Sequence, residues 1–419
     1  MAAQRDISIR VYGRPNETSP YQVDATLDDD SYFPGGQLQI PDQELLKLDL
    51  DLQPYGSLLG QCLFTAPILR ALEKAYATVS SKSASQMRLR LCIDPNAADL
   101  HAYPWERLFV QWQGSAIPLA ASSLIPFSRF IPLEEGQQDP IEERPIRLLL
   151  AVSSPIRLPE GLVHIDVENQ LRSLTSAIAT VHDLAVTVLP GHTQLSDTYL
   201  QELATLGIKV LPGSTTLERL IDAAGQHHIV HLLSHGTFDG TTAALFLEKE
   251  DGDFEKAIDT DITAGIASLS EKPKLIYLSA CDSANQTGAQ ANKSARPMVG
   301  LAPKLVQAGV PAVIAMQTQV EIETARKLAA SFYAKVLDSG EVDRALSEAR
   351  FEIYGPKATE WWIPVLFLRL KNGRLFATDP VREAIQATLQ KSPRKEDRFY
   401  LPLEAISLKG KELIRDWER

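Results

Sequence analysis

The chain has 419 residues, of which 44% are hydrophobic and 23% charged, which is typical of a folded protein with a sizeable core. Its formal net charge of −11 argues against a nucleic-acid partner, because such binding depends on Lys and Arg at phosphates. The chain has only three cysteines, which fits a reducing compartment better than a disulfide framework. It has no apolar run long enough to span a bilayer and no signal-peptide pattern at Met1–Arg10, so we expect a cytoplasmic protein without a membrane partner.

Residues 1–140 are expected to form a smaller α/β accessory domain. Alternating or apolar runs predict strands at 7–12, 21–27 and 87–93, and helical spacing predicts a helical region at 55–79 interrupted by Pro67. Trp105, beside Pro104, is expected to act as a wedge at a domain interface, and residues 128–131 are predicted to be an edge strand. The charged, Gln-rich segment 134–144 is the predicted linker.

Residues 145–376 are expected to form a second α/β domain. Its predicted strands span residues 146–152, 228–234, 243–247, 273–280, 312–316 and 363–370, and its predicted helices 167–181, 215–224, 299–308, 322–337 and 342–354. Segments 184–189 and 208–211 compete for one further strand, because each carries a Val-Leu-Pro-Gly sequence. The charged tail, residues 377–419, contains two short helix candidates at 381–389 and 409–417 and is either a partner-binding element or a packed extension.

Two apolar runs in the second domain each end in a side chain that could react. Residues 228–234 are followed by His235-Gly236, and residues 273–280 are followed by Cys281-Asp282. Ligands of open α/β sheets bind beyond the carboxyl ends of the strands. If the two strands are neighbours, an imidazole and a thiol face one cleft, as a cysteine nucleophile requires. The N–H groups of Gly236 and Cys281 are candidate donors to the developing oxyanion.

The runs Ile-Val-His-Leu-Leu-Ser-His-Gly and Leu-Ile-Tyr-Leu-Ser-Ala-Cys-Asp-Ser resemble the two catalytic blocks of caspase-like cysteine peptidases, and in particular those of the CHAT family. The resemblance extends from about Met87 to Phe376 and includes a Tyr-Pro-Trp-Glu block at residues 103–106. The Gln-Ala-Cys-x-Gly pattern of animal caspases is replaced here by Ser-Ala-Cys-Asp-Ser. The preference of animal caspases for aspartate at the cut bond therefore does not carry over to this chain.

The resemblance implies a caspase-like, doubly wound and mostly parallel sheet flanked by helices, with the first domain as a candidate pseudo-caspase half. It implies a cysteine endopeptidase in which His235 is the base and Cys281 the nucleophile. That chemistry requires neither a cofactor nor a metal, and the His and Cys spacings do not suggest zinc. The resemblance also implies a protein substrate that could be encoded nearby, a candidate regulatory protein partner, and a role in bacterial defence or cell death.

Several neighbours of this pair are candidates for substrate binding. Asp282 either lines the pocket, where it would favour Lys or Arg before the cut bond, or is an exposed turn residue or a partner of Arg296. Gln317, at the end of a predicted strand, is expected to bind substrate backbone, and Asp239 is a candidate to orient His235 and to line the same site. The polar segment 283–298 is either an activation loop that is cut or an uncut loop.

His231, inside its apolar run, is expected to be structural. Two other functions compete with the peptidase hypothesis. A catalytically silent caspase-like scaffold would need neither His235 nor Cys281, so the intact pair argues against it. A nucleotide-binding domain is disfavoured because no Gly-x-Gly-x-x-Gly or Walker-type loop follows a predicted strand.

Overall fold

The structure is a computed structural model that describes residues 5–13, 21–80, 86–112, 115–132, 139–160, 162–239, 241–279, 296–318, 320–355 and 359–378. The N-terminal half contains β1 (Arg5–Gly13), β2 (Tyr21–Leu27), β3 (Tyr32–Leu38), α1 (Asp42–Lys47), α2 (Leu52–Leu63), α3 (Ala66–Ser80), β4 (Met87–Ile93), β5 (Phe109–Trp112), β6 (Ser115–Pro118) and β7 (Phe127–Phe130).

The C-terminal half alternates strands and helices. Its strands are β8 (Ile146–Val152), β9 (Leu184–Leu189), β10 (Lys209–Val210), β11 (Ile229–Leu233), β12 (Gly236–Phe238), β13 (Ala243–Glu248), β14 (Phe254–Ile258), β15 (Leu275–Ser279), β16 (Ala312–Met316) and β17 (Pro364–Leu368). Its helices are α4 (Val167–Ile178), α5 (Asp197–Thr205), α6 (Leu217–Ala224), α7 (Asp259–Ser268), α9 (Arg296–Gln307), α10 (Ile322–Ser339) and α11 (Val342–Ile353).

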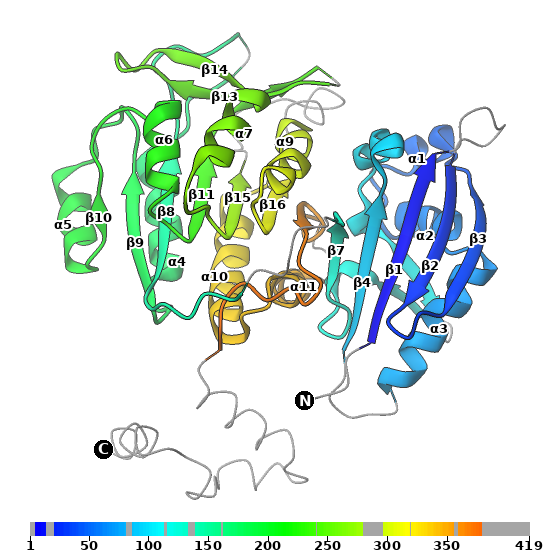
Figure 1. Ribbon diagram of the computed structural model, residues 1–419. Helices are drawn as coiled ribbons and strands as arrows, with labels where there is room; N and C mark the ends of the chain where they lie inside the picture. The colour runs from blue at the N-terminus through cyan, green and yellow to red at the C-terminus, as the bar shows by residue number, and fades with distance from the viewer. Residues whose placement is uncertain are drawn as a thin grey trace, which may run out of the picture.

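One sheet of twelve strands runs through both halves of the protein (Figure 1). Its order is β10-β9-β8-β11-β15-β16-β17-β7-β4-β1-β2-β3. The six strands from β10 to β16 are all parallel, and β17 runs antiparallel to β16. The predicted α/β class with a mostly parallel sheet flanked by helices is therefore confirmed.

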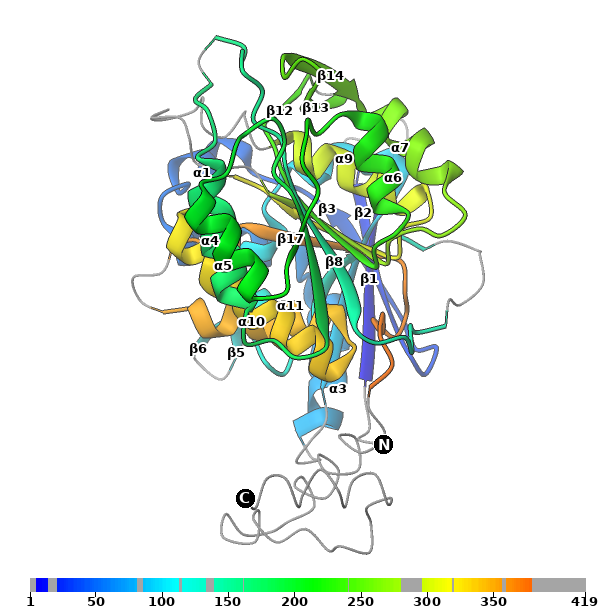
Figure 2. The ribbon, with the colours of Figure 1, turned by 90° about the vertical axis from the view of Figure 1, so that its left-hand side faces the viewer.

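Alternate residues of the central strands face two separate hydrophobic cores. Leu148, Leu150 and Val152 of β8 pack in the core that includes α4, α10 and α11, whereas Leu149 and Ala151 pack in the core that includes α6, α7 and α9. Figure 2 shows these two groups of helices on opposite sides of the sheet. Because both faces of these strands are covered, their sequences are apolar runs rather than polar–apolar alternations.

Three sequence-based predictions about strands need correction. The predicted edge strand at residues 128–131 is wrong, since β7 lies inside the sheet between β17 and β4. The strand predicted at residues 363–370 is present as β17, but it joins the two halves rather than closing the sheet. The two Val-Leu-Pro-Gly segments do not compete, because β9 and β10 both form and pair in parallel. The predicted tail helices at 381–389 and 409–417 lie outside the described residues.

A buried ion pair also connects the two halves. Arg88 of β4 is 1% exposed, and its guanidinium donates to the carboxylate of Asp343, which is 0% exposed and lies on α11. Glu341 lies 3.5 Å from the same guanidinium. Removing one member of such a pair leaves a charge in a low-dielectric interior, which is much more costly than losing an exposed pair.

We predict that Asp343→Ala lowers the free energy of unfolding by about 3 kcal/mol, because Arg88 keeps its charge and its burial but loses its main partner. The matched control is Glu323→Ala, which removes an exposed pair with Arg326 on α10. Denaturant unfolding of both variants provides the measurement. Equal stability changes in the two variants would contradict a structural role for the buried pair.

Candidate active site

The candidate site lies where β11 and β15 end, at the carboxyl edge of the sheet. These strands are parallel neighbours, with Leu233 paired to Ser279 as the last pair in the register. Beyond that pair, the N–H of Ser234 donates to the carbonyl of Ser279 at 3.2 Å. The strands from which His235 and Cys281 follow are therefore adjacent, in the same direction and in register, as the sequence-based hypothesis required.

His235 is held by a backbone carbonyl from the loop between β8 and α4. Its Nε2 lies 2.9 Å from the carbonyl oxygen of Val163, and His235 is 6% exposed. A carbonyl oxygen can only accept a hydrogen bond, so Nε2 must carry a proton, and in the neutral ring the lone pair is then on Nδ1. This contact therefore selects the tautomer in which Nδ1 can act as a base.

The surroundings of His235 favour its neutral form. Burial lowers the pKa of His235, the Val163 carbonyl partly offsets this effect, and the nearby His164 lowers the pKa further. The ring is therefore neutral at pH 7 in the absence of a nearby anion. A neutral imidazole can remove a proton from a thiol, and a thiolate would stabilise the imidazolium that results.

The backbone after His235 turns into a small antiparallel sheet formed by β12, β13 and β14. The N–H of Phe246 on β13 donates to the carbonyl of His235 at 2.9 Å, and Gly236 is paired with Leu245. In an antiparallel ladder, this places Gly236 and Leu245 at a non-hydrogen-bonded pair. The N–H of Gly236 is consequently directed away from β13, as an oxyanion donor would have to be.

A buried carboxylate connects the loops around this edge. Glu248, at the end of β13, is 0% exposed and accepts hydrogen bonds from the N–H groups of Ser154, His192 and Thr215, at 3.1, 2.7 and 2.8 Å. Burial raises the pKa of Glu248, and the three N–H donors oppose that rise. Gly191 permits this close approach, because a Cβ there would lie 2.4 Å from a Glu248 oxygen. No sequence pattern marks Glu248 as a site residue, because it stands at the end of an ordinary apolar strand.

Asp239 lies in the turn between β12 and β13. Its Oδ1 accepts from the N–H groups of Thr241 and Thr242, at 2.9 and 2.7 Å, and these bonds lower its pKa. Orientation of His235 by Asp239 stays a prediction, and the contact that the structure describes for the ring is with the Val163 carbonyl. No sequence pattern identifies that carbonyl, because every residue type has one.

Gln317 follows β16 at the same edge, but its side chain is bonded to the N-terminal half and to Trp362, two residues before β17. Its Nε2 donates to Glu106 at 2.9 Å and to the carbonyl of Trp362 at 3.0 Å, while its Oε1 accepts from Arg129 at 3.3 Å. Both polar groups of the amide thus have internal partners. Contact between Gln317 and a substrate stays a prediction, and the structure gives the residue an architectural role.

The Glu of the Tyr-Pro-Trp-Glu block belongs to this junction. Glu106 is 0% exposed and receives two hydrogen bonds from Arg129 of β7, at 3.1 and 2.7 Å. Trp105, also 0% exposed, donates from Nε1 to the carbonyl of Leu100 at 2.7 Å. The block therefore places a buried anion against Gln317, near the carboxyl edge of the sheet.

Cys281, Asp282 and the proposed activation loop through residue 295 lie outside the described residues. The roles predicted for them stay predictions. The other two cysteines are described: Cys62 is partly buried and Cys92 is buried. Burial raises the pKa of the Cys62 thiol, and it raises the pKa of Cys92 to about 12.

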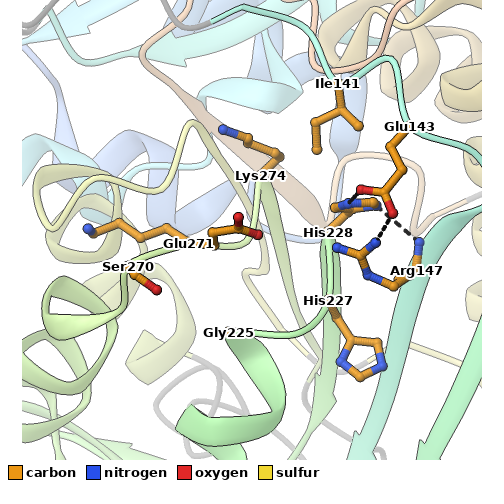
Figure 3. A pocket seen from close by; sticks show the side chains of 10 residues that line it. Ile141, Glu143, Arg147, Gly225, His227, His228, Ser270, Glu271 and Lys274 are labelled. Carbon is orange, nitrogen blue, oxygen red and sulfur yellow. Dashed lines mark hydrogen bonds and ion pairs between the residues drawn. The ribbon is translucent and has the colours of Figure 1, made fainter.

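A cavity of about 380 Å³ lies far along the sheet from His235, at the edge where β8, β11 and β15 begin (Figure 3). Its lining includes Glu143, which lies between Arg147 and His228 and interacts with both. Because the strands run from this edge toward the carboxyl edge, the cavity is separate from the candidate active site.

Within the described ranges, none of the helices combines the length and apolar character that crossing a membrane requires. The model of a protein family described as "CHAT domain" matches residues 53–400 of this chain. Among curated proteins, none matches the chain.

Two solved structures align with this chain at low sequence identity. Separase of Saccharomyces cerevisiae, in complex with securin, aligns with a TM-score of 0.37 and 13% identity, over 80% of this chain and 21% of the separase chain. The chain thus spans about a fifth of that separase. The complex of the pro- and mature domains of Porphyromonas gingivalis RgpB aligns with a TM-score of 0.38 and 11% identity, over 81% of this chain and 79% of that chain.

We predict that His235 is the Nε2–H tautomer and that its protonation midpoint lies below 6.5, since burial disfavours the imidazolium. Nitrogen-15 NMR of the histidines in Cys281→Ala measures both properties without a neighbouring thiolate. His235→Gln identifies the signal by its loss. An Nδ1–H tautomer would show that the Val163 contact does not set the tautomer of this ring, and a midpoint above 6.5 would show that burial does not dominate its protonation.

Proposed function

Because the chain belongs to the CHAT domain family, we propose that it is a caspase-like cysteine endopeptidase, with Cys281 as nucleophile and His235 as base. The observation that carries the proposal is the register of β11 and β15, which pairs Leu233 with Ser279. His235 and Cys281 each follow the last paired residue by two positions. Two residues of extended chain reach about 7 Å at most, which supports the proposal that the two side chains meet at one part of the sheet edge.

The proposed reaction uses a thiol, an imidazole and two backbone N–H groups. Nδ1 of His235 takes the proton of the Cys281 thiol, and the sulfur attacks the carbonyl carbon of the substrate peptide bond. The carbonyl oxygen gains negative charge, for which the N–H groups of Gly236 and Cys281 are the proposed donors. The imidazolium then protonates the leaving amine, and water hydrolyses the thioester to release the second product and regenerate the thiol.

Two features of the described geometry support these assignments. The Val163 carbonyl at 2.9 Å leaves the lone pair on Nδ1 and stabilises the imidazolium formed during the reaction, since Nε2–H then belongs to a cation. The pairing of Gly236 with Leu245 turns the Gly236 N–H away from its own ladder.

The proposed substrate is a specific protein, which could be encoded nearby, and the proposed setting is a regulated bacterial defence or cell-death pathway in the cytoplasm. We propose in addition that Asp282 contacts the substrate residue before the cut bond. A carboxylate at that position would favour Lys or Arg there, through a charge-assisted hydrogen bond.

Thiol labelling tests the proposed nucleophile without knowledge of the substrate. At pH 7 we expect iodoacetamide to modify Cys281 at least tenfold faster than Cys62 or Cys92, because burial raises the pKa of both of those thiols. His235→Ala should slow modification of Cys281, and Cys62→Ala should not. Peptide mass spectrometry after timed labelling gives the rates. Similar alkylation rates for Cys281 in wild type and in His235→Ala would contradict the proposed pairing of His235 with Cys281.

Cleavage is tested by mass spectrometry of new protein termini, with proteins encoded by adjacent genes as the first candidates. We expect cuts in the presence of wild type that are lost with Cys281→Ala and with His235→Ala. Cuts that persist in Cys281→Ala would exclude this mechanism. Binding of a partner by both wild type and variant, with no cut under any activating condition, would instead favour the scaffold hypothesis.

The cut sites also test Asp282. We expect Lys or Arg before the cut bond, and we expect Asp282→Ala to lower kcat/KM for such a peptide about tenfold, by loss of a charge-assisted bond. A matched peptide with Leu at that position should be affected much less. Equal effects on both peptides would assign Asp282 to a turn rather than to the substrate pocket.

A further inference from the structure

A buried histidine beneath the proposed site has hydrogen-bonding partners on both sides of its ring. His231 of β11 is 2% exposed, with Nδ1 3.0 Å from the hydroxyl of Tyr333 on α10 and Nε2 3.2 Å from the hydroxyl of Ser279. Its ring stacks on Tyr277, with centroids 4.3 Å apart and 28° between the planes. The position and the tilt of this ring are therefore fixed by three separate contacts.

The surroundings keep this ring neutral. Burial lowers the pKa of His231 to about 3, and the ring lies in the apolar core that also contains Leu150, Leu233 and Ile314. A neutral imidazole has one donor and one acceptor, and each hydroxyl can serve either role, so both bonds can be made at once. Such a buried polar group is costly unless all of its bonds are satisfied, which makes its geometry well defined.

The hydrogen bonds continue from His231 to the ends of both strands. Ser279, which contacts the ring, is the last residue of β15, and its carbonyl accepts from the N–H of Ser234 at 3.2 Å. The hydroxyl of Ser234 donates to the carbonyl of His235 at 2.7 Å. One connected series thus runs from Tyr333 on α10 through His231 and Ser279 to the peptide of His235.

We propose that His231 is a positioning residue for the proposed peptidase reaction, because its ring fixes the end of β15 relative to the end of β11. This inference rests on the proposed function. Ser279 is two residues before Cys281, and the same series ends at His235, so a shift at the His231–Ser279 contact changes the separation of base and nucleophile. A displacement of about 1 Å can reduce an enzymatic rate roughly 100-fold.

Substitutions of His231 and Ser279 test the proposal. His231→Phe keeps the aromatic packing but removes both ring nitrogens, and we expect kcat to fall 10- to 100-fold with KM changed less than threefold. His231→Gln keeps a donor and an acceptor and should recover part of the rate. Ser279→Ala should lower kcat about tenfold, and the double variant should be no slower than His231→Phe, because the two residues act as one unit.

The matched control is Tyr199→Phe, which removes a buried hydroxyl that lies 3.0 Å from Thr175, away from both strand ends. It should lower the melting temperature without changing kcat. The pH dependence of Cys281 alkylation adds a readout that needs no substrate: the apparent thiol pKa should rise toward 8.5 in His231→Phe and Ser279→Ala, and it should not move in Tyr199→Phe.

Two results would overturn the proposal. One is a lower melting temperature in His231→Phe and Ser279→Ala with kcat and the alkylation profile as in wild type. The other is rate losses that simply multiply in the double variant. Absence of any cleavage by wild type would instead count against the proposed function, and the alkylation profiles would still decide whether His231 positions the strand ends. If His231→Phe fails to fold, kcat and the alkylation profile of Ser279→Ala and His231→Gln are compared with those of wild type instead.

Discussion

The parallel pairing of β11 with β15 is the contact on which the candidate active site depends. It pairs Leu233 with Ser279, so that β11 and β15 end at the same level of the sheet. A slip of one residue would move every side chain of one strand to the opposite face. That slip is opposed from both sides, because Ile229 and Leu233 pack in one core while Val230 and Leu232 pack in the other.

Backbone groups, rather than side chains, shape most of the carboxyl edge. A carbonyl at Val163 selects the tautomer of His235, and three backbone N–H groups converge on the buried carboxylate of Glu248. The N-terminal half contributes from the other side, where Glu106 binds Gln317 after β16. The continuous sheet therefore also shapes this edge, because it brings Glu106 of the N-terminal half within hydrogen-bonding distance of Gln317 in the C-terminal half.

The sequence patterns predicted the parts of the fold that depend on local periodicity. The apolar runs at β8, β11, β15 and β16 are buried on both faces and were recognisable for that reason. The place of a strand in the sheet is not local information, which explains why β7 was mistaken for an edge strand. Its short sequence gives no sign that β17 and β4 cover both of its sides.

The candidate site likewise contains features that have a local sequence signature and features that have none. The position of His235 just after a buried strand is predictable from the sequence, because an imidazole at the end of an apolar run is an unusual pattern. The Val163 carbonyl and the bonds of Gln317 are not, because the first has no side-chain signature and the second depends on residues about 200 positions away, at Glu106 and Arg129. His231 was expected to be structural, and its bond to Ser279 gives it a place between the two strand ends.

The most direct test of the central claim is whether the residues at positions 235 and 281 lie side by side. Neighbouring strands are about 4.8 Å apart, which is within the Cα separation that a disulfide bond requires. In a His235→Cys variant that also carries Cys62→Ser and Cys92→Ala, mild oxidation should link the introduced thiol to Cys281, as a crosslinked peptide pair in mass spectrometry. Recovery of both thiols as free, alkylatable groups after oxidation of the folded protein would contradict the account.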